Sequence, residues 1–353
     1  MNVERRLSEE AYKAMRVMIA EYAVGSCDER RISLLREGRA MLHTLRKSFE
    51  SLGHDVVSPY EEHDFADAVE KLSKKSDAGI VIAPDDILAE LTAVVEENTL
   101  NLGCPSEAVR ICADKLRTTE ILRENGIPAP EIYDFRSSCH ISNAHTNSKG
   151  TGEHRIVIKP RYGCGSEGVF VVRDICDVCD VLPPADQIPA DQILTSYVEG
   201  DDVSVSMVAG ASNALLLTVN KQHVNRYKVR NRDDVGDVGV EFKVEERLVF
   251  EGCSVPYTVE EIWLSALKRL SVRAAHVLGC RGYFGIDFVL GNDGNAYVVD
   301  VNPRATTALV CVARVLNIEI ADLILRAARD ELPAEDEICV CGKCTFRLSA
   351  SPV

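Results

Sequence analysis

The stretch Tyr283–Thr307 reads YFGIDFVLGNDGNAYVVDVNPRATT. Two short apolar runs, YFGIDFVL and NAYVVDVN, flank the turn sequence GNDG, so this stretch predicts a β-hairpin. Asp287 lies in the first predicted strand, and Asp300 and Asn302 lie two residues apart near the end of the second. Side chains two apart share one face of a strand, and antiparallel pairing can bring Asp287 beside them.

Two carboxylates and an amide oxygen among apolar neighbours favour a hard cation, such as Mg²⁺ bound partly through the phosphates of a substrate. The alternative interpretation is a pair of exposed acids at the edge of a hairpin. The motifs elsewhere in the chain favour the metal site.

The global composition indicates a folded globular protein. The chain has 353 residues, enough for two or three subdomains, and its net charge of −15 argues against a nucleic-acid or anionic membrane partner. No apolar run approaches the roughly 20 residues that span a bilayer. The N-terminal sequence MNVERRLSEEAYKAMRV lacks the apolar core of a signal peptide, so we predict a cytoplasmic protein.

Thirteen cysteines are scattered through mostly apolar segments, which predicts reduced thiols in the core. Two local groups have spacings that metal ligands also show. They are Cys176-x-x-Cys179 and Cys339-x-Cys341-x-x-Cys344. A zinc site would need four ligands, and neither group has the remaining ones close by in the sequence.

The first part of the chain alternates predicted strands and helices. A strand over 16–25 runs into a glycine turn, and helices over 33–51, 64–75 and 85–97 alternate with the short runs DVVSP, AGIVIAP and LGCP. This pattern predicts an open α/β domain over residues 1–112 with a mostly parallel sheet. No G-x-G-x-x-G follows the first strand, so a dinucleotide is not indicated.

A helix from Ser106 is predicted to continue through ADKLRTTEILRENG, with Lys115 on its surface. Residues 136–152 are polar and predict an exposed loop. The run HRIVIKP then predicts a strand that ends at Lys159, directly before RYGCGSEGVFVV. Glycine-rich hairpin loops are usually simple turns, but they can also close over phosphates. The lysine immediately before this one favours the phosphate role.

Further strands are predicted on both sides of Gly200 and over LLLTVNKQHV, which carries Lys221 and Gln222 at its end. A loop over 225–241, helices over 258–278 and 306–330, and a last strand over 345–349 complete the predicted chain. Two lysines, a glycine loop and a metal site are what triphosphate chemistry requires, because the negative charge must be offset while a phosphoryl group moves. The G-x-x-x-x-G-K-[ST] motif and the kinase signatures are missing.

The segments ADKLRT, VIKPRYGCGSEGV, YVEGDDVSV, FGIDFVL and VDVNPR resemble, in order and spacing, those of the ATP-grasp superfamily of carboxylate–amine ligases. The resemblance runs from Asp114 to about Thr307, behind a pre-ATP-grasp α/β domain. It implies an α/β and α+β architecture in which two α+β subdomains hold the nucleotide. Residues 113–195 would form the small lid subdomain and residues 196–353 the large subdomain with the metal site.

The resemblance also implies roles for individual residues. Lys115 and Lys159 would contact the phosphates of ATP, with Lys159 also counted as catalytic, and Asp202 would hold the ribose. The backbone of Thr195, Tyr197 and Val198 would read adenine, and the lid loop would contain Gly163, Gly165, Ser166 and Gly168. One or two Mg²⁺ or Mn²⁺ ions would be carried by Asp287, Asp300 and Asn302. Many members carry Glu where Asp300 stands, so the shorter acid here can alter how two metals are bridged.

The segment EYAVGSCDERRISLLREGRAML, with VNKQHV and DVNPRATT, is similar to the archaeal branch that contains tyramine–L-glutamate ligases of methanofuran biosynthesis. This resemblance implies that ATP activates the γ-carboxyl of glutamate as an acylphosphate and that tyramine displaces phosphate. One alternative is another ATP-grasp ligase, which would act in dipeptide or pyrrolysine formation. Another is a nucleotide-binding regulatory module without turnover.

Within that reaction, Arg304 is the candidate for stabilising the oxyanion or the acylphosphate, and its alternative role is a surface charge after Pro303. Candidate anchors for substrate carboxylates are Lys221, Arg226 and Arg232. Glu21 and Glu37 are candidates to meet a substrate amine, although Glu37 is equally a helix-surface acid. The expected partners are therefore an amino acid and an amine, and the apolar front helices permit a homodimer.

Overall fold

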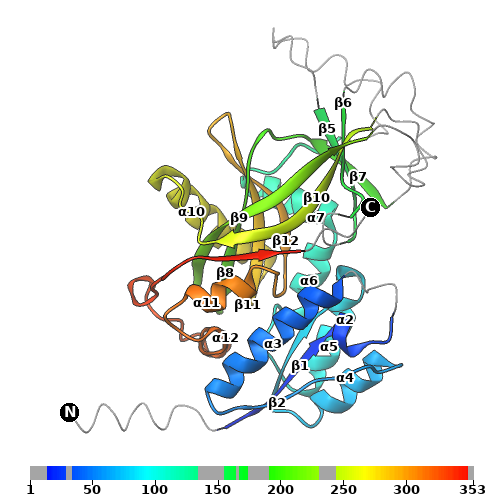
Figure 1. Cartoon of the computed structure of the whole chain (residues 1–353), viewed down its shortest axis with the longest axis vertical. Helices are drawn as coiled ribbons and strands as arrows, with labels where there is room; N and C mark the ends of the chain where they lie inside the picture. Colours follow the sequence, from blue (N-terminus) through cyan, green and yellow to red (C-terminus); the bar gives the residue numbers. More distant parts are fainter. Residues whose placement is uncertain are drawn as a thin grey trace.

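The computed structural model describes residues 14–28, 34–133, 155–163, 167–173, 191–229 and 244–348. These residues form two sheets with their helices, stacked along the long axis of the molecule (Figure 1). None of the helices in the described segments combines the length and the apolar character needed to cross a lipid bilayer.

The smaller sheet confirms the parallel α/β fold that was predicted for residues 1–112, the front part of the molecule. Its four strands in the described chain have the order β2-β1-β3-β4 and are all parallel. They are β1 (Arg16–Glu21), β2 (Asp55–Val57), β3 (Ala78–Ile82) and β4 (Leu100–Asn101). Helix α3 (Leu35–Ser51) packs on one face, and α4 (Phe65–Ser73) and α5 (Asp85–Asn98) pack on the other. Because both faces are covered, β1 is an almost continuous apolar run.

The end of strand β1 and the helix predicted from Ser106 differ from the prediction. Strand β1 ends at Glu21 because its side chain accepts the backbone N–H of Val24 and so begins the short helix α2 (Tyr22–Gly25). The helix predicted from Ser106 is two helices, α6 (Ser106–Ala113) and α7 (Lys115–Glu124). Asp114 separates them because its backbone is extended and its carboxylate caps α7 by accepting the N–H of Arg117.

The larger sheet is antiparallel, and nine of the described strands belong to it. Its path is β12-β11-β8-β9-β10-β6-β5-β7, and β13 pairs with β10. The bounds are β5 (Arg155–Pro160), β6 (Phe170–Arg173), β7 (Gln192–Ser196), β8 (Gly200–Ala209), β9 (Ala214–Lys228), β10 (Val244–Val255), β11 (Gly282–Gly291), β12 (Ala296–Asn302) and β13 (Cys344–Arg347). One continuous sheet therefore crosses the boundary predicted between residues 195 and 196, and the division into subdomains stays a prediction.

Several elements of the second half also differ from their predicted bounds. Strand β9 continues to Lys228, four residues into the predicted loop 225–241, because β10, which was not predicted, supplies its hydrogen-bonding partner. Helix α10 (Glu261–Leu278) and strand β13 agree with the prediction. The predicted final helix 306–330 is two helices, α11 (Leu309–Val315) and α12 (Ile320–Arg329). Between them, Leu316 forms a bridge to Val340 and leaves the helical path. A short 3₁₀ turn follows at Glu335–Glu337.

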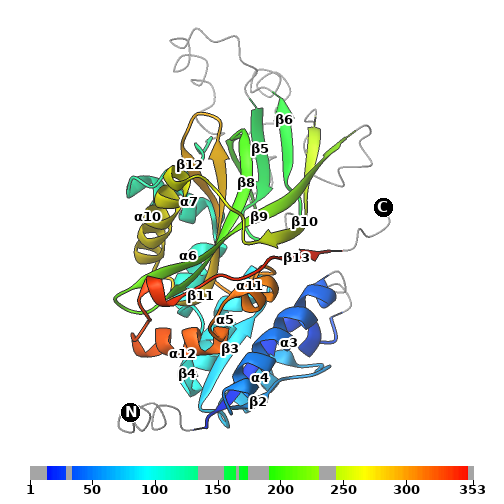
Figure 2. The same cartoon turned by 60° about the vertical axis from the view of Figure 1, so that its left-hand side comes forward.

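The two halves of the molecule share two buried apolar clusters. Met41 and Leu45 of α3 belong to the same buried cluster as Leu309 of α11 and Ile324 of α12. Figure 2 shows α3 beside α11, and α11 in turn lies against β13, the strand of the large sheet that pairs with β10. The front part is therefore packed against the helices that follow the predicted metal-binding hairpin.

The expectation that all cysteines are reduced is wrong for one pair. Cys311 of α11 and Cys344 of β13 form a disulfide, because the packing of β13 over α11 brings their Cα atoms to 5.2 Å. Cys104, Cys112, Cys253 and Cys280 are buried free thiols, as predicted, while Cys27, Cys339 and Cys341 are free and exposed. Cys176 and Cys179 lie outside the described residues. In the described parts of the chain, no group of three or more His, Cys, Asp or Glu side chains is arranged to hold a metal ion.

Candidate active site

The predicted hairpin is present, and its register brings the three predicted metal-binding side chains together. Asp287 of β11 pairs with Asp300 of β12, and Gly285 pairs with Asn302, so all three side chains share one face. Asn302 Nδ2 donates to Asp287 Oδ2 at 3.1 Å, and Gln222 Nε2 donates to Asp287 Oδ1 at 2.8 Å. Burial raises the pKa of Asp287 to about 7, and the neighbouring charge of Asp300 adds to the rise.

Both predicted phosphate-binding lysines lie at this hairpin. Lys115 Nζ is 3.3 Å from Asp300 Oδ1 and donates to the carbonyl of Gly163 at 2.8 Å. Lys159 Nζ donates to the carbonyl of Val299 at 2.9 Å. We refer to Lys115, Lys159, Asp287, Asp300 and Asn302 as the charged cluster. It joins the start of α7, the end of β5 and the hairpin β11–β12.

The pKa values of the two lysines shift in opposite directions. It lowers the pKa of Lys159 to about 8, and the carboxylate of Asp300 offsets only part of the effect. Burial also lowers the pKa of Lys115, but Asp300 and Asp85 outweigh it, so the net pKa is raised. The side chain of Lys115 is only 11% exposed, so the expectation of a surface lysine is wrong. The break at Asp114 explains this, because it turns the first residue of α7 inward.

The front part of the molecule supplies an acid to the same place. Asp85, the first residue of α5, has a side chain that is 6% exposed. Its Oδ2 lies 3.6 Å from Lys115 Nζ, and its Oδ1 lies 3.8 Å from Arg304 Nε. Arg304 is itself 13% exposed, so it is not the surface charge that was its alternative interpretation. The sequence around Asp85, APDD, is an ordinary helix start and gave no signal for this role.

Glu21 lies near both Arg304 and Glu37. Glu21 is 5% exposed, and burial raises its pKa to about 7 although the backbone N–H groups of Val24 and Ala23 oppose the rise. Glu37 of α3 accepts a hydrogen bond from Thr307 Oγ1 at 2.6 Å. Glu37 is thus tied to the segment that follows the hairpin, and it is not simply a helix-surface acid.

Other predicted ligand-binding residues pair with one another. Arg226 Nη2 donates to Asp202 Oδ2 at 2.8 Å, and Arg226 Nε lies 3.4 Å from the hydroxyl of Tyr197. Lys221 Nζ donates to Asp201 Oδ1 at 3.0 Å and lies over the ring of Tyr257. A ligand that uses Asp202, Arg226 or Lys221 would therefore have to exchange these contacts for its own.

The structure describes part of the glycine-rich loop that follows β5, and it describes the segment that follows β7. Gly163 and Gly168 have φ values of +139° and +69°, conformations that favour glycine. Gly165, Ser166 and Arg232 lie outside the described residues. Thr195 is buried in β7, and the N–H of Tyr197 donates to the carbonyl of Arg155 at 3.0 Å.

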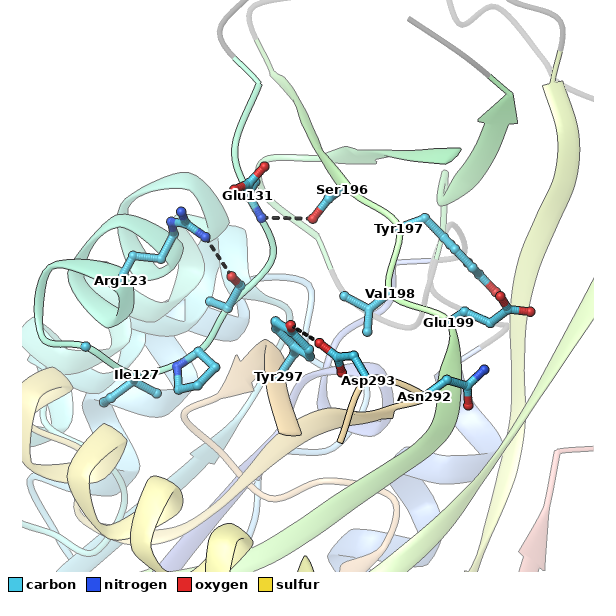
Figure 3. Close-up of a pocket in the computed structure, with 13 residues that line it drawn as sticks. Arg123, Ile127, Glu131, Ser196, Tyr197, Val198, Glu199, Asn292, Asp293 and Tyr297 are labelled. Carbon is cyan, nitrogen blue, oxygen red and sulfur yellow. Dashed lines mark hydrogen bonds between the residues drawn. The ribbon is translucent and has the colours of Figure 1, made fainter. Parts of the chain in front are cut away.

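A cavity of about 680 Å³ adjoins the segment that follows β7 (Figure 3). Arg123 and Ile127 lie on one side of it, Tyr197 and Glu199 lie on the other, and Tyr297 between them donates to Asp293. Among the residues predicted to hold adenine, Tyr197 and Val198 line the cavity. In the described part of the chain, the members of the charged cluster are not among its lining residues.

The side chains of the charged cluster fit a divalent cation that also binds phosphate. Burial raises the pKa of Asp287, and the carboxylate of Asp300, its partner across the hairpin, raises it further, so a cation between the two would offset negative charge. An ion at this point would receive two carboxylates and one amide from the protein, and substrate oxygens or water would complete its shell. Mg²⁺ is commonly held in this way.

Comparison with known proteins agrees with this arrangement. Residues 112–308 match the model of an ATP-grasp domain, and residues 31–109 match that of a pre-ATP-grasp domain. The tyramine–L-glutamate ligase of Methanocaldococcus jannaschii is 25% identical over 339 residues, covering 89% of this chain and 90% of that protein.

Solved structures show the same fold. An ATP-grasp superfamily protein from Archaeoglobus fulgidus has a TM-score of 0.64 at 23% identity, and 88% of each chain is covered. The biotin carboxylase domain of 2-oxoglutarate carboxylase from Hydrogenobacter thermophilus, solved with MgADP and bicarbonate, has a TM-score of 0.65 at 14% identity. The match covers 94% of this chain and 74% of that chain.

Proposed function

The chain belongs to the ATP-grasp family of ligases, and from that premise we propose that it joins the γ-carboxyl group of L-glutamate to the amino group of tyramine. The observation that carries the proposal is the charged cluster, in which two buried lysines meet two carboxylates on one hairpin face. The choice of substrates is supported by the 25% identity to a tyramine–L-glutamate ligase over most of both chains.

The proposed reaction has two steps. The carboxylate of glutamate attacks the γ-phosphorus of ATP, which forms an acylphosphate and releases ADP. The amine then attacks the acyl carbon, the C–O bond to phosphate breaks, and the amide and inorganic phosphate result. The protein contributes positioning and charge stabilisation, and no residue becomes covalently linked to the substrate.

Lys115 and Lys159 would offset the charge of the triphosphate, with Lys159 held at the reacting phosphoryl group. The loop containing Gly163, Gly165, Ser166 and Gly168 would cover the phosphates. Thr195, Tyr197 and Val198 would contact adenine through their backbone, and Asp202 would contact the ribose after exchange of its pairing with Arg226.

Asp287, Asp300 and Asn302 would hold Mg²⁺ or Mn²⁺. When bound, the ion supplies positive charge that stabilises the phosphate oxygens during transfer. Arg304 would stabilise the oxyanion of the second step. Lys221, Arg226 and Arg232 would anchor the α-carboxylate of glutamate.

Formation of ADP with MgCl₂, ATP, L-glutamate and tyramine tests the reaction when each component is omitted in turn. We expect ADP only in the complete mixture, together with a glutamyl-tyramine product in the mass spectrum. ADP formation that ignores both substrates would contradict the specific assignment. ADP formation with another acid and amine would favour the alternative of a different ATP-grasp ligase.

Two substitutions test the charged cluster. Lys159→Ala and Asp300→Ala should each lower kcat by at least about a hundredfold, because each removes a preorganised charge from the phosphoryl-transfer site. Lys74→Ala is a matched control, since Lys74 pairs with Glu70 on the exposed face of α4 and should leave kcat unchanged. Wild-type rates in either cluster variant would refute the role of that residue.

A further inference from the structure

Asp85 is a buried acid from outside the segment that carries the charged cluster. It begins α5 in the front part of the molecule, and its side chain is 6% exposed. An ionised carboxylate at this depth is costly unless cations neutralise it. Its two oxygens face different partners, with Oδ2 at 3.6 Å from Lys115 Nζ and Oδ1 at 3.8 Å from Arg304 Nε.

These two partners belong to different steps of the reaction. Lys115 also contacts Asp300 and the carbonyl of Gly163, so it lies between a proposed metal ligand and the glycine loop. Arg304 follows the hairpin by two residues and is proposed to act on the acyl group. Because Asp85 contacts both side chains, it can fix the distance between Lys115, which would bind the phosphates, and Arg304, which would bind the acyl group.

We propose that Asp85 is a positioning residue. Its carboxylate pairs with Lys115, which also pairs with Asp300, and it orients the side chain of Arg304. The inference deepens the proposed function and rests on it. Because Asp85 neutralises part of the positive charge of Lys115, Lys115 neutralises less of the negative charge of Asp300, and that charge remains available to bind Mg²⁺. Without Asp85, Lys115 would pair with Asp300 alone and compete with the metal, and Arg304 would lose an ion-pair partner.

A binding experiment without turnover tests the effect on Lys115. MgCl₂ is titrated at a fixed concentration of ADP, and calorimetry or a fluorescent ADP analogue reports nucleotide binding. Asp85→Asn should raise the Mg²⁺ concentration for half-maximal binding about tenfold, the factor that corresponds to about 1.4 kcal/mol. Asp86→Asn is the matched control, because it removes the same charge from the exposed next residue of the same helical turn. Its Mg²⁺ requirement should stay within about twofold of wild type.

Asp85→Glu separates positioning from a purely structural role. It restores the negative charge, so the Mg²⁺ requirement should return to within about threefold of wild type. If Asp85→Asn does not fold, this variant and Asp86→Asn still decide the question. A Glu variant that folds but requires as much extra Mg²⁺ as expected for Asn would overturn the proposal, as would an unchanged requirement in Asp85→Asn.

The link to Arg304 is tested by a double-mutant cycle on turnover. At saturating MgCl₂, where the effect through Lys115 is removed, Asp85→Asn should lower kcat about tenfold in the wild-type background and by less than about twofold in the Arg304→Gln background. Equal factors in both backgrounds would refute the link. Failure of this inference and of the proposed function can be told apart, because the Mg²⁺ titration needs neither glutamate nor tyramine. Wild-type protein that binds no nucleotide would refute the proposed function, whereas equal Mg²⁺ requirements in wild type and Asp85→Asn refute the role of Asp85 alone.

Discussion

Burial, more than the type of side chain, distinguishes the residues of the candidate site. Lys159 and Asp287 have pKa values that move toward each other, to about 8 and about 7, because both charges are removed from water. Such shifts are common at functional sites. Gln222 belongs with them, since it donates to Asp287 and holds that carboxylate in place.

Glu21 should make the stability of the protein depend on pH. Its pKa is about 7 in the folded protein against an ordinary value of 4.5, so folding favours the protonated form. This contribution to stability is fully present below about pH 4.5 and is lost as the pH rises through about 7, and the total loss is up to about 3 kcal/mol. Glu21→Gln mimics the protonated acid, so this variant should be more stable than wild type at pH 8 and nearly equal to it at pH 4.5.

Urea unfolding at several pH values measures this difference directly. Glu97→Gln, on the exposed surface of α5, is the control and should follow wild type throughout. A difference between Glu21→Gln and wild type that does not change with pH would show that the buried acid is not responsible.

Among the elements, the pairing of β8 with β11 holds the site in register. Gly200 begins β8 and pairs with Gly291, and a Cβ atom on Gly200 would lie 2.0 Å from the carbonyl oxygen of Leu290. The backbones thus approach each other too closely for any side chain. Two residues later, β8 carries Asp202, so an error in this pairing would also move a proposed nucleotide contact.

Gly200→Ala should therefore lower the free energy of unfolding by about 1–3 kcal/mol, because the methyl group forces the two strands apart. Gly103→Ala is the comparison, since a Cβ there meets only Asn101 Oδ1 at 3.4 Å. Chemical denaturation of both variants checks the prediction, which fails if the two substitutions have the same effect.

Local patterns predicted the elements whose signals lie within a few residues. The hairpin at 282–302 and the parallel front sheet follow from alternation, turn residues and helical spacing. Strand β10 was missed because its sequence, VEERLVFEGCSV, mixes charges with apolar residues, and its pairing with distant β9 and β6 stabilises it. The role of Asp85 depends on partners 30 and 219 residues away, and no local pattern encodes such distances.

Buried apolar side chains join the N-terminal part of the molecule to the ligase part. Leu45 of α3 is 1% exposed and belongs to the cluster that also contains Leu309 and Val312 of α11. The predicted subdomain boundaries and the homodimer stay predictions. The apolar contact between the halves nevertheless indicates that front part and ligase part unfold together.

Leu45→Ala should lower the free energy of unfolding by about 2–5 kcal/mol, the range for a buried Leu that leaves a cavity. The thermal transition should move as one unit, because the cavity lies in the core that both halves share. Leu100→Ala, at a residue that is 46% exposed, should shift the transition much less. Calorimetry that resolves two transitions, with only one of them moved by Leu45→Ala, would contradict the shared core.

The hydrogen bond between Glu37 and Thr307 and the ion pair between Asp85 and Arg304 have a consequence for evolution and engineering. Both interactions join the first quarter of the chain to residues 304–307. A substitution of Arg304 or Thr307 therefore requires a matching substitution of Asp85 or Glu37. A chimera that takes its front domain from one relative and its ligase part from another would leave these acids facing foreign neighbours. New specificities are thus more accessible by exchanging the two segments as a matched set than by recombining them freely.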